Sequence, residues 1–213
     1  MSVLDAIANT PLVELRRVVP EGSARIVAKL ESSNPTGGMK DRMALAAILA
    51  AEADGRLGPG GTIVEYTGGT TGVSLAFVAA ARGYPIRIIF SDAFSQEKGL
   101  MMRALGAEVM MVPSHGLGIS ESLIKRMISE AQVFSEQPGH WWVDQLNNRD
   151  AIDGYLPLGE EVWRQTGGKV QAFVHAVGTA HSLHGAVQAL RGHKQDLLAI
   201  AVEPDESAVL SGC

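Results

Sequence analysis

The stretch Asn34-Pro35-Thr36-Gly37-Gly38-Met39-Lys40-Asp41-Arg42 carries one lysine at the point where a glycine-bearing turn passes into an alanine-rich segment. Residues 41–53 predict a helix with a face of small residues, and Gly55 predicts its end. Lys40 therefore stands at a helix start, where the helix dipole favours anions and an ordinary solvated lysine is electrostatically poor. This placement suggests a reactive amine, because a partly desolvated primary amine is neutral and nucleophilic.

Two further loops follow expected strands and precede expected helices, namely Thr67-Gly68-Gly69-Thr70-Thr71-Gly72 and Gly178-Thr179-Ala180-His181-Ser182. In parallel sheets, ligands collect beyond the carboxyl ends of the strands, where unpaired amides at helix starts point outward. Glycine allows close approach of the backbone, and the amides favour negative charge. We expect a carboxylate at 67–72 and a phosphate at 178–182. With Lys40, these loops indicate an enzyme that holds a phosphorylated cofactor covalently.

Short β-rich runs alternate with helix-like segments along the chain, which is typical of repeated strand-helix-strand units. The expected strands are 24–30, 62–66, 86–90, 108–112, 172–177 and 198–202, and the expected helices are 41–53, 73–82, 95–105, 120–130, 158–165 and 183–191. The segment 138–150 reads as irregular and aromatic. The pattern predicts an α/β fold with a parallel sheet covered by helices, in two lobes that join near residue 145.

Composition excludes several classes of protein. The chain of 213 residues is 46% hydrophobic, which is ordinary for a globular protein with a real core. Its formal charge of −5 and the lack of long basic runs argue against a nucleic-acid partner. No apolar run approaches the roughly 20 residues that cross a bilayer, and we expect a cytoplasmic protein without a membrane partner. Cys213 is the only cysteine, so an internal disulfide is excluded and a catalytic thiol is not expected.

These residues resemble a known family, the fold-type II pyridoxal-phosphate enzymes, and specifically the cysteine synthase (O-acetylserine sulfhydrylase) group. The resemblance covers essentially the whole chain, and its motifs are Asn9-Thr10-Pro11-Leu12, Asn34 to Arg42, Pro59 to Glu65, Gln145-Leu146-Asn147-Asn148 and Val202-Glu203-Pro204. It implies a two-lobed parallel-sheet fold of the tryptophan synthase beta-like type. Residues 41–145 would form the smaller, substrate-loop lobe, and residues 1–40 with 146–213 the larger, cofactor lobe. A homodimer is also implied.

The resemblance assigns roles to individual residues. Lys40 would form the Schiff base with pyridoxal 5'-phosphate and later remove the α-proton of the substrate. The residues that would hold the phosphate are Gly178, Thr179, Ala180, His181 and Ser182. The residues that would hold the carboxylate of the substrate are Thr67, Gly68, Gly69 and Thr71, with help from Gln145. Thr70 would lie beside the cofactor ring.

Both loops depart from the usual pattern of the family. The family has Thr-Ser-Gly-Asn-Thr-Gly where this chain has Gly68 in place of serine and Thr70 in place of asparagine. It has Gly-Thr-Gly-Gly-Thr where this chain has Ala180 and His181 in place of the two later glycines. Because buried polar groups discriminate strongly between substrates, we expect these changes to alter substrate choice without abolishing cofactor binding.

Some of these residues also have a purely structural interpretation. The loop 67–72 would serve equally as a helix cap, and Gln145 as the side chain that satisfies a turn, although function is favoured for both. The spacing of the histidines at 175, 181 and 184 suggests a metal site. Packing or capping roles are favoured for them, because no cysteine or carboxylate completes the set. Ala180 and His181 require backbone angles that suit non-glycine residues, and His181 is a candidate donor to the phosphate.

Two neighbouring pairs are expected to be structural. Trp141 and Trp142 suggest lobe packing rather than a stacking platform. Asp41 and Arg42 suggest an ion pair with contacts at the helix start.

The most specific reading is β-replacement on an activated serine, most directly O-acetyl-L-serine plus sulfide giving L-cysteine. The alternatives are a related lyase or synthase (a cystathionine or diaminoacid synthase, or a serine dehydratase) and a non-catalytic binding subunit of the same fold. Members of the family continue well beyond the region that resembles 201–213, and that part would supply the group facing the pyridine nitrogen. We therefore expect a chain that is truncated, incompletely observed or completed by a partner.

Overall fold

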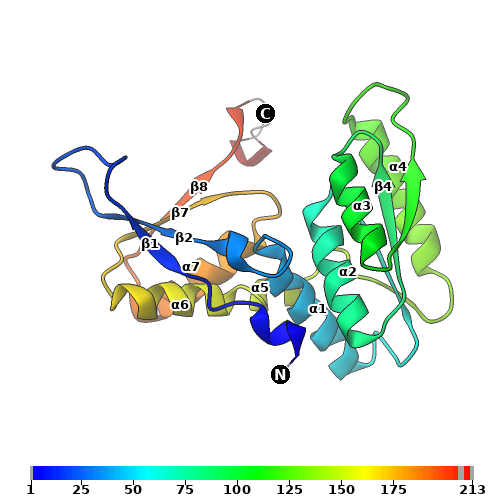
Figure 1. The fold of residues 1–213 in the computed structure, drawn as a ribbon, viewed down its shortest axis with the longest axis horizontal. Helices are drawn as coiled ribbons and strands as arrows, with labels where there is room; N and C mark the ends of the chain where they lie inside the picture. Colours follow the sequence, from blue (N-terminus) through cyan, green and yellow to red (C-terminus); the bar gives the residue numbers. More distant parts are fainter. Residues whose placement is uncertain (1, 206–208, 212–213) are drawn as a thin grey trace.

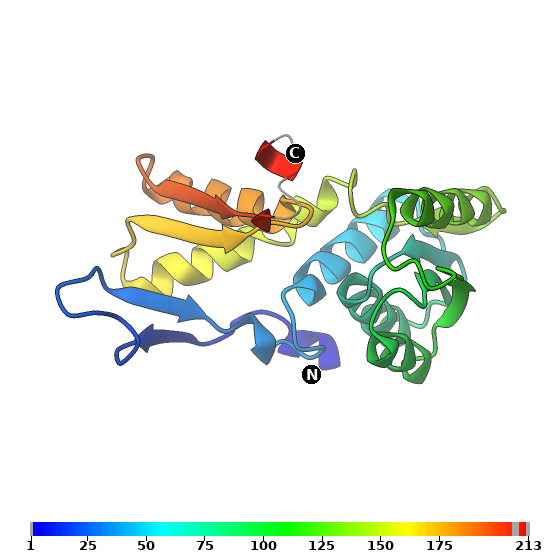
Figure 2. The ribbon, with the colours of Figure 1, turned by 90° about the horizontal axis from the view of Figure 1, so that it is seen from above.

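The computed structural model describes residues 2–205 and 209–211, so Cys213 lies outside the described residues. The elements fall into two groups on either side of helix α1 (Lys40–Asp54), as Figure 1 shows. One group is built on a four-stranded sheet. The other contains two separate strand pairs and three helices, and Figure 2 shows that both strand pairs lie at the end of the molecule away from the four-stranded sheet.

The four-stranded sheet is parallel throughout, in the order β5-β4-β3-β6. Its strands are β3 (Thr62–Tyr66), β4 (Ile86–Ser91), β5 (Glu108–Val112) and β6 (His140–Trp142), and its helices are α2 (Thr70–Arg82), α3 (Gln96–Ala104) and α4 (Glu121–Ser135). Successive side chains of a strand point to opposite faces. Ile63 and Ile88 accordingly enter the core formed with α1 and α2, whereas Val64 and Ile89 pack with α4 on the other face.

The second group contains an antiparallel pair, β1 (Leu12–Leu15) with β2 (Ile26–Lys29), and a parallel pair, β7 (Ala172–Ala176) with β8 (Leu198–Val202). Its helices are α5 (Asp150–Asp153), α6 (Leu156–Thr166) and α7 (His181–His193), and three short 3-10 turns are η1 (Val3–Ala6), η2 (Glu31–Ser33) and η4 (Val209–Ser211). Helices α6 and α7 pack closely because Gly159 has no side chain. A Cβ atom there would collide with the carbonyl oxygen of Ala186.

Helix α1 connects the two groups. It packs on α2 and on α5, and its residues Ala44, Ala47, Ile48 and Ala51 are fully buried. Small residues on this face let the neighbouring helices approach closely. Lys40 is the first residue of α1, so the orientation of this buried helix also fixes the start of the lysine side chain.

The predicted α/β fold with a parallel sheet is confirmed, with differences at the ends of elements. Strands 62–66, 108–112 and 198–202 match their predicted bounds. Helices α2, α6 and α7 begin two or three residues earlier than predicted, since their first turns consist of loop-like polar residues or, in α6, a proline suited to a first turn. The segment expected to be irregular contains β6. The antiparallel β1–β2 pair was not predicted.

The predicted ion pair between Asp41 and Arg42 is wrong. Asp41 accepts the backbone N–H of Thr36 at 2.8 Å, while Arg42 points away from it. The guanidinium donates to Glu31 at 2.7 Å through Nε and to Glu161 at 2.7 Å through Nη1. Neighbouring residues of a helix lie about 100° apart around its axis, so adjacent side chains do not face each other.

Arg42 lies at the centre of a buried charge cluster that also includes Glu31, Glu161 and Lys29. The Lys29 Nζ atom lies 2.6 Å from Glu161 Oε2. Burial alone would raise the pKa of Glu161, but hydrogen bonds from Arg42 and Lys29 outweigh it and bring the pKa to about 2. The cluster ties the start of α1 to β2, η2 and α6.

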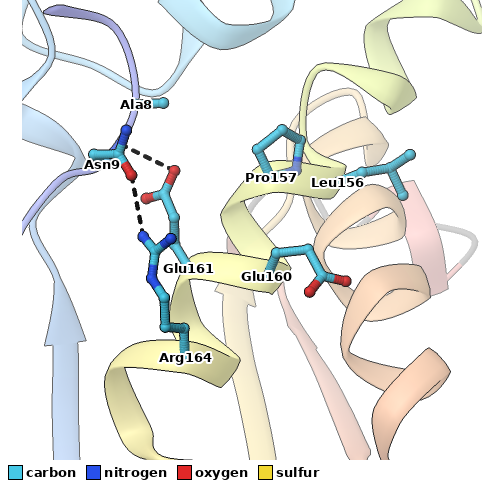
Figure 3. A pocket seen from close by; sticks show the side chains of 7 residues that line it. All are labelled: Ala8, Asn9, Leu156, Pro157, Glu160, Glu161 and Arg164. Carbon is cyan, nitrogen blue, oxygen red and sulfur yellow. Dashed lines mark hydrogen bonds between the residues drawn. The ribbon is translucent and has the colours of Figure 1, made fainter.

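A hollow of about 370 Å³ opens beside this cluster, lined by Ala8, Asn9, Leu156, Pro157, Glu160, Glu161 and Arg164. Figure 3 shows the backbone N–H of Asn9 directed at Glu161 and the guanidinium of Arg164 directed at the side chain of Asn9. None of the predicted site residues lines it. The hollow is therefore separate from the candidate site. Within residues 2–205 and 209–211, no helix is long and apolar enough to cross a membrane.

Candidate active site

Lys40 is held by the turn that precedes α1. The backbone N–H of Gly37 donates to the carbonyl of Asn34 at 2.8 Å, and Gly37 has φ 82°, which glycine adopts without strain. Asn34 is buried, and its Oδ1 accepts the N–H of Ala8 at 2.9 Å. The carboxylate of Asp41 holds Thr36 from the other side. These contacts leave little freedom in the segment that delivers the lysine.

The lysine amine reaches the predicted phosphate loop. Lys40 Nζ donates to Thr179 Oγ1 at 3.4 Å, a contact between residues 139 positions apart. The side chain is half-buried, and burial lowers the pKa of the Lys40 amine, although the charge of Glu65 acts against this shift. A lowered pKa increases the neutral fraction of the amine, which is the form that acts as nucleophile and base.

The phosphate loop presents a row of backbone N–H groups at the start of α7. The first helical hydrogen bond runs from the N–H of His184 to the carbonyl of Ala180. Within the described part of the chain, the six N–H groups of residues 178–183 have no hydrogen-bond acceptor. A Cβ atom at Gly178 would meet nothing within 4 Å, so space is open beside these donors. Such a row of free amides at a helix start is suited to a phosphate.

The phosphate loop keeps a left-handed, glycine-like backbone at Ala180, so the expectation of backbone angles that suit a non-glycine residue is wrong at this position. Ala180 adopts φ 64°, a left-handed conformation that costs a non-glycine residue about 1 kcal/mol. The buried Ser182 hydroxyl shares a 2.8 Å hydrogen bond with His175 Nε2. Burial lowers the pKa of His181, and the charge of Lys40 acts in the same direction. A neutral His181 still carries one N–H donor.

The contact between His175 and Ser182 also bears on the metal interpretation. Among the residues that the structure describes, no group of three or more histidine, cysteine, aspartate or glutamate side chains is placed to hold a metal ion. His175 contacts a hydroxyl rather than another potential ligand, and β7 and α7 position the two partners across the loop.

The substrate loop lies between β3 and α2. Thr67 Oγ1 accepts the N–H of Gly69 at 2.9 Å and that of Gly72 at 3.3 Å, so the hydroxyl closes the loop from inside. Gly69 has φ 145°, a conformation that side chains rarely allow. Thr70 is exposed, and its Cγ2 would lie 3.3 Å from a Cβ atom at Gly38. The loop therefore contacts the turn that delivers Lys40.

Gln145 and Thr71, which the sequence separates widely, are brought together. Thr71 Oγ1 donates to Gln145 Oε1 at 2.6 Å, and Gln145 Nε2 lies 3.4 Å from the carbonyl of Tyr66, to which it donates. Both predicted substrate residues thus belong to one cluster at the carboxyl end of β3.

The exposed side of the substrate loop faces α3 and the segment before it. A Cβ atom at Gly68 would lie 3.0 Å from the ring of Phe94, and one at Gly69 would lie 3.0 Å from Lys98 Cγ. Phe94 therefore occupies the space in which a serine at 68 would place its side chain. Sequence reasoning did not identify this contact, because nothing in the segment 92–98 signals it.

Glu65 is the second residue that sequence reasoning missed. It is fully buried on β3, and its carboxylate accepts the backbone N–H of Gln145 at 3.0 Å. The available signal was a single acidic residue within the apolar strand Thr62–Tyr66, because charged side chains are rarely buried without a reason.

Comparison with known proteins decides the family. A model of the family described as "Pyridoxal-phosphate dependent enzyme" matches residues 3–213. The chain belongs to this family. It is 37% identical to cysteine synthase B of Salmonella typhimurium over 208 residues, which are 97% of this chain and 66% of that protein. It is 38% identical to cysteine synthase of Staphylococcus aureus over 213 residues, which are 99% of this chain and 67% of that protein.

Solved structures show the same fold. O-ureido-L-serine synthase matches with a TM-score of 0.90 at 37% identity, over 99% of this chain and 65% of the other. O-acetyl serine sulfhydrylase isoform 3 of Entamoeba histolytica matches with a TM-score of 0.89 at 33% identity, over 100% of this chain and 63% of the other. The predicted family and the predicted two-lobed fold class are confirmed. The chain spans about two thirds of the length of these relatives.

The residues present fit the cofactor of the pyridoxal-phosphate family. Its phosphate requires several N–H donors, and the six free N–H groups of 178–183 with the hydroxyls of Thr179 and Ser182 supply them. Its aldehyde requires a primary amine close to that phosphate site, and Lys40 Nζ contacts Thr179. Both requirements are met by one cluster of described residues.

Proposed function

We propose that this chain carries the cofactor and substrate sites of an enzyme that replaces the β-substituent of an activated serine, with O-acetyl-L-serine and sulfide giving L-cysteine as the leading reaction. The single observation that supports it most is the contact of Lys40 Nζ with Thr179 at the start of α7. That contact joins a half-buried amine to a row of free amides. The curated relatives named cysteine synthase direct the choice of substrates.

In this proposal Lys40 holds the cofactor and later moves a proton. Pyridoxal phosphate, when bound, supplies an electron sink that stabilises negative charge at the α-carbon of an amino acid. Lys40 takes the α-proton, because its lowered pKa keeps part of the amine neutral. The free N–H groups of 178–183, Thr179, Ser182 and His181 bind the phosphate.

The substrate loop orients the amino acid. We propose that Thr67, Gly68, Gly69, Thr71 and Gln145 surround its carboxylate, and that Thr70 lies beside the cofactor ring, next to Gly38. The hydroxyl of Thr71 and the amide of Gln145 are already joined at 2.6 Å, so their geometry is set before the substrate arrives. The amide of Gln145 keeps a second N–H that can donate to a carboxylate, and ordering it costs little because its orientation is already set.

Two wider expectations belong to the same proposal. Residues 41–145 would form a lobe that moves against the remainder and shields the reacting groups from water. The enzyme would act as a homodimer in the cytoplasm, as the resemblance implies.

The proposal is tested by mixing the purified protein with pyridoxal phosphate and recording its visible spectrum. We expect a shifted cofactor band that the Lys40→Ala variant lacks, and formation of L-cysteine from O-acetyl-L-serine and sulfide. The control is Lys98→Ala, which removes an amine elsewhere beside the substrate loop. A cofactor band in neither the wild type nor Lys40→Ala would favour a non-catalytic subunit of the same fold.

A second candidate is β-replacement with a nucleophile other than sulfide. The contact between Gly68 and Phe94 favours it, because an aromatic ring replaces the hydroxyl that cysteine synthases usually place there. One solved relative is O-ureido-L-serine synthase, so the fold accommodates the synthesis of another substituted serine. Turnover of O-acetyl-L-serine with a panel of nucleophiles decides between the two. Sulfide as the poorest member of the panel would favour the second candidate.

A further inference from the structure

Glu65 is a buried acid that the proposed chemistry does not use. Its side chain lies at the end of β3, immediately before the substrate loop, with an exposed fraction of 0%. Among the described residues its hydrogen-bond donors are three N–H groups, none of which belongs to a cationic side chain. Oε1 accepts from the backbone of Tyr66 at 2.9 Å and from the indole of Trp142 at 3.3 Å, and Oε2 accepts from the backbone of Gln145 at 3.0 Å.

Only a carboxylate suits this arrangement fully. Three donors converge on two oxygens, so each oxygen must act as an acceptor. A glutamine at the same place would direct an amide N–H₂ group at one of the three donors. An alanine would leave all three buried N–H groups without this acceptor, which is costly in a buried site.

The backbone just before Gln145 is strained. Asp144 adopts φ 50°, in the left-handed region that disfavours a residue with a side chain. The turn is closed by the N–H groups of Asn147 and Asn148, which donate to the carbonyl of Asp144 at 3.0 and 2.9 Å. Strain of this kind persists only where surrounding contacts hold it. The bond from the Gln145 N–H to Glu65 is such a contact, one residue after the strained position.

These contacts form a chain from the buried acid to the substrate loop. Glu65 holds the backbone of Gln145, and the side chain of Gln145 accepts the hydroxyl of Thr71. We propose that Glu65 is a positioning residue of the substrate site, whose carboxylate fixes Gln145 where it can grip the substrate carboxylate. The inference rests on the proposed function of Gln145, and it adds a residue that acts through another.

Electrostatics adds a pH dependence to this role. Burial raises the pKa of Glu65 to about 8, although its three N–H donors act in the opposite direction, and Asp144 raises the pKa further. The titratable groups that face it are Lys40 from α1, Asp144 from the turn and Tyr66 beside it on β3. Below that pKa a proton occupies the carboxyl group and weakens the hold on Gln145. Above it, all three donors are satisfied.

The test compares the wild type with Glu65→Gln, loaded with pyridoxal phosphate. L-Serine is the probe, and its binding is followed through the visible spectrum at about pH 6.5 and about pH 9, either side of the titration. Loss of a buried hydrogen bond weakens affinity by about tenfold. We expect that loss at the higher pH and a smaller loss at the lower pH, where the wild-type acid is itself protonated. Cofactor affinity should change little.

The matched control is Trp142→Phe, which removes one donor to Oε1 and leaves the bond to Gln145 in place. It should bind L-serine within about twofold of the wild type, since only the hold on Gln145 matters. Steady-state turnover of O-acetyl-L-serine gives a second reading, in which Glu65→Gln raises KM more than it lowers kcat. Equal L-serine affinities for wild type and Glu65→Gln at both pH values would overturn the proposal.

A second measurement does not depend on the proposed function. The backbone N–H signal of Gln145 in a ¹⁵N NMR spectrum should titrate with a midpoint near 8 in the wild type and lose that titration in Glu65→Gln. If the wild type gives no cofactor band, the proposed function fails, and the NMR titration still decides whether Glu65 holds Gln145. If the Gln145 signal titrates in the same way in the wild type and in Glu65→Gln, the inference is contradicted in either case.

Discussion

Burial and neighbouring charge decide the protonation of single ionisable side chains in this protein. Lys40 and Glu65 are both shifted toward neutrality by burial, whereas Glu161 is kept ionised because Arg42 and Lys29 donate to it. The same solvent exclusion therefore has opposite outcomes, according to whether a cation is within hydrogen-bonding distance. The amine of Lys40 gains a neutral fraction, and the carboxylate of Glu161 stays charged beside its two cations.

Thermal stability should fall as pH rises because of Glu65. Burial raises its pKa in the folded state to about 8, above the 4.5 of an exposed glutamate. Between these values the folded chain keeps a proton that the unfolded chain has lost, so this residue destabilises the fold progressively as pH rises toward 8. We expect Glu65→Gln to flatten the decline of Tm between about pH 5.5 and about pH 8.5. Melting curves of both proteins check this, and parallel declines would contradict it.

The Ser182→Ala substitution should weaken the binding of pyridoxal phosphate. The hydroxyl lies at the start of α7 and shares a hydrogen bond with His175. In the proposed function it also donates to the charged phosphate. Loss of that donor is worth about 1.5–3 kcal/mol, or at least tenfold in affinity. A titration followed by the visible spectrum measures it. The control is Ser135→Ala at the surface, which should bind the cofactor like the wild type. Unchanged affinity in Ser182→Ala would remove this serine from the phosphate site.

At the scale of elements, the sequence predicted strands and helices better than the contacts between their loops. Alternating apolar runs and glycine stops define β3 and α1, so these elements were predicted within one or two residues. Lys40 and the loops at 67–72 and 178–182 followed from the same pattern and the resemblance. Glu65 and Phe94 did not, because their roles depend on segments that meet only in the folded chain.

The substrate loop and α3 should be coupled through Gly68 and Phe94. A serine at 68 would bring its Cβ to 3.0 Å from the ring, so Gly68→Ser must displace Phe94 or distort the loop. We expect Gly68→Ser to weaken substrate affinity by about tenfold, at a cost of about 1–3 kcal/mol for overpacking. Adding Phe94→Ala should recover most of the loss. A double-mutant cycle on KM checks this, and strictly additive effects would contradict direct contact.

At the scale of the whole molecule, the buried charge cluster around Arg42 joins the start of α1 to β2, η2 and α6. Arg42 is 3% exposed and bonds both Glu31 and Glu161. Arg42→Met would leave two acids in the interior without their main cation, which destabilises a protein by about 3–5 kcal/mol. Urea denaturation measures the change. The sequence did not predict this cluster, since its members lie on four different elements and Glu161 is 119 residues from Arg42.

An exposed ion pair provides the control for that prediction. Arg82 and Glu52 lie 2.7 Å apart on α2 and α1, and the side chain of Arg82 is 40% exposed. Arg82→Gln should cost less than about 1 kcal/mol, because solvent screens the pair. Comparable losses in Arg82→Gln and Arg42→Met would show that the buried cluster does not hold α1 to β2, η2 and α6.

In the proposed function the cofactor is attached to the amine of Lys40. Reducing the pyridoxal-phosphate-loaded protein with borohydride, digesting it and mapping the peptides by mass spectrometry tests this claim directly. We expect a phosphopyridoxyl group on the peptide that contains Lys40 and on no other. A protein that carries no label, or carries it on another lysine such as Lys98 or Lys29, would contradict the account.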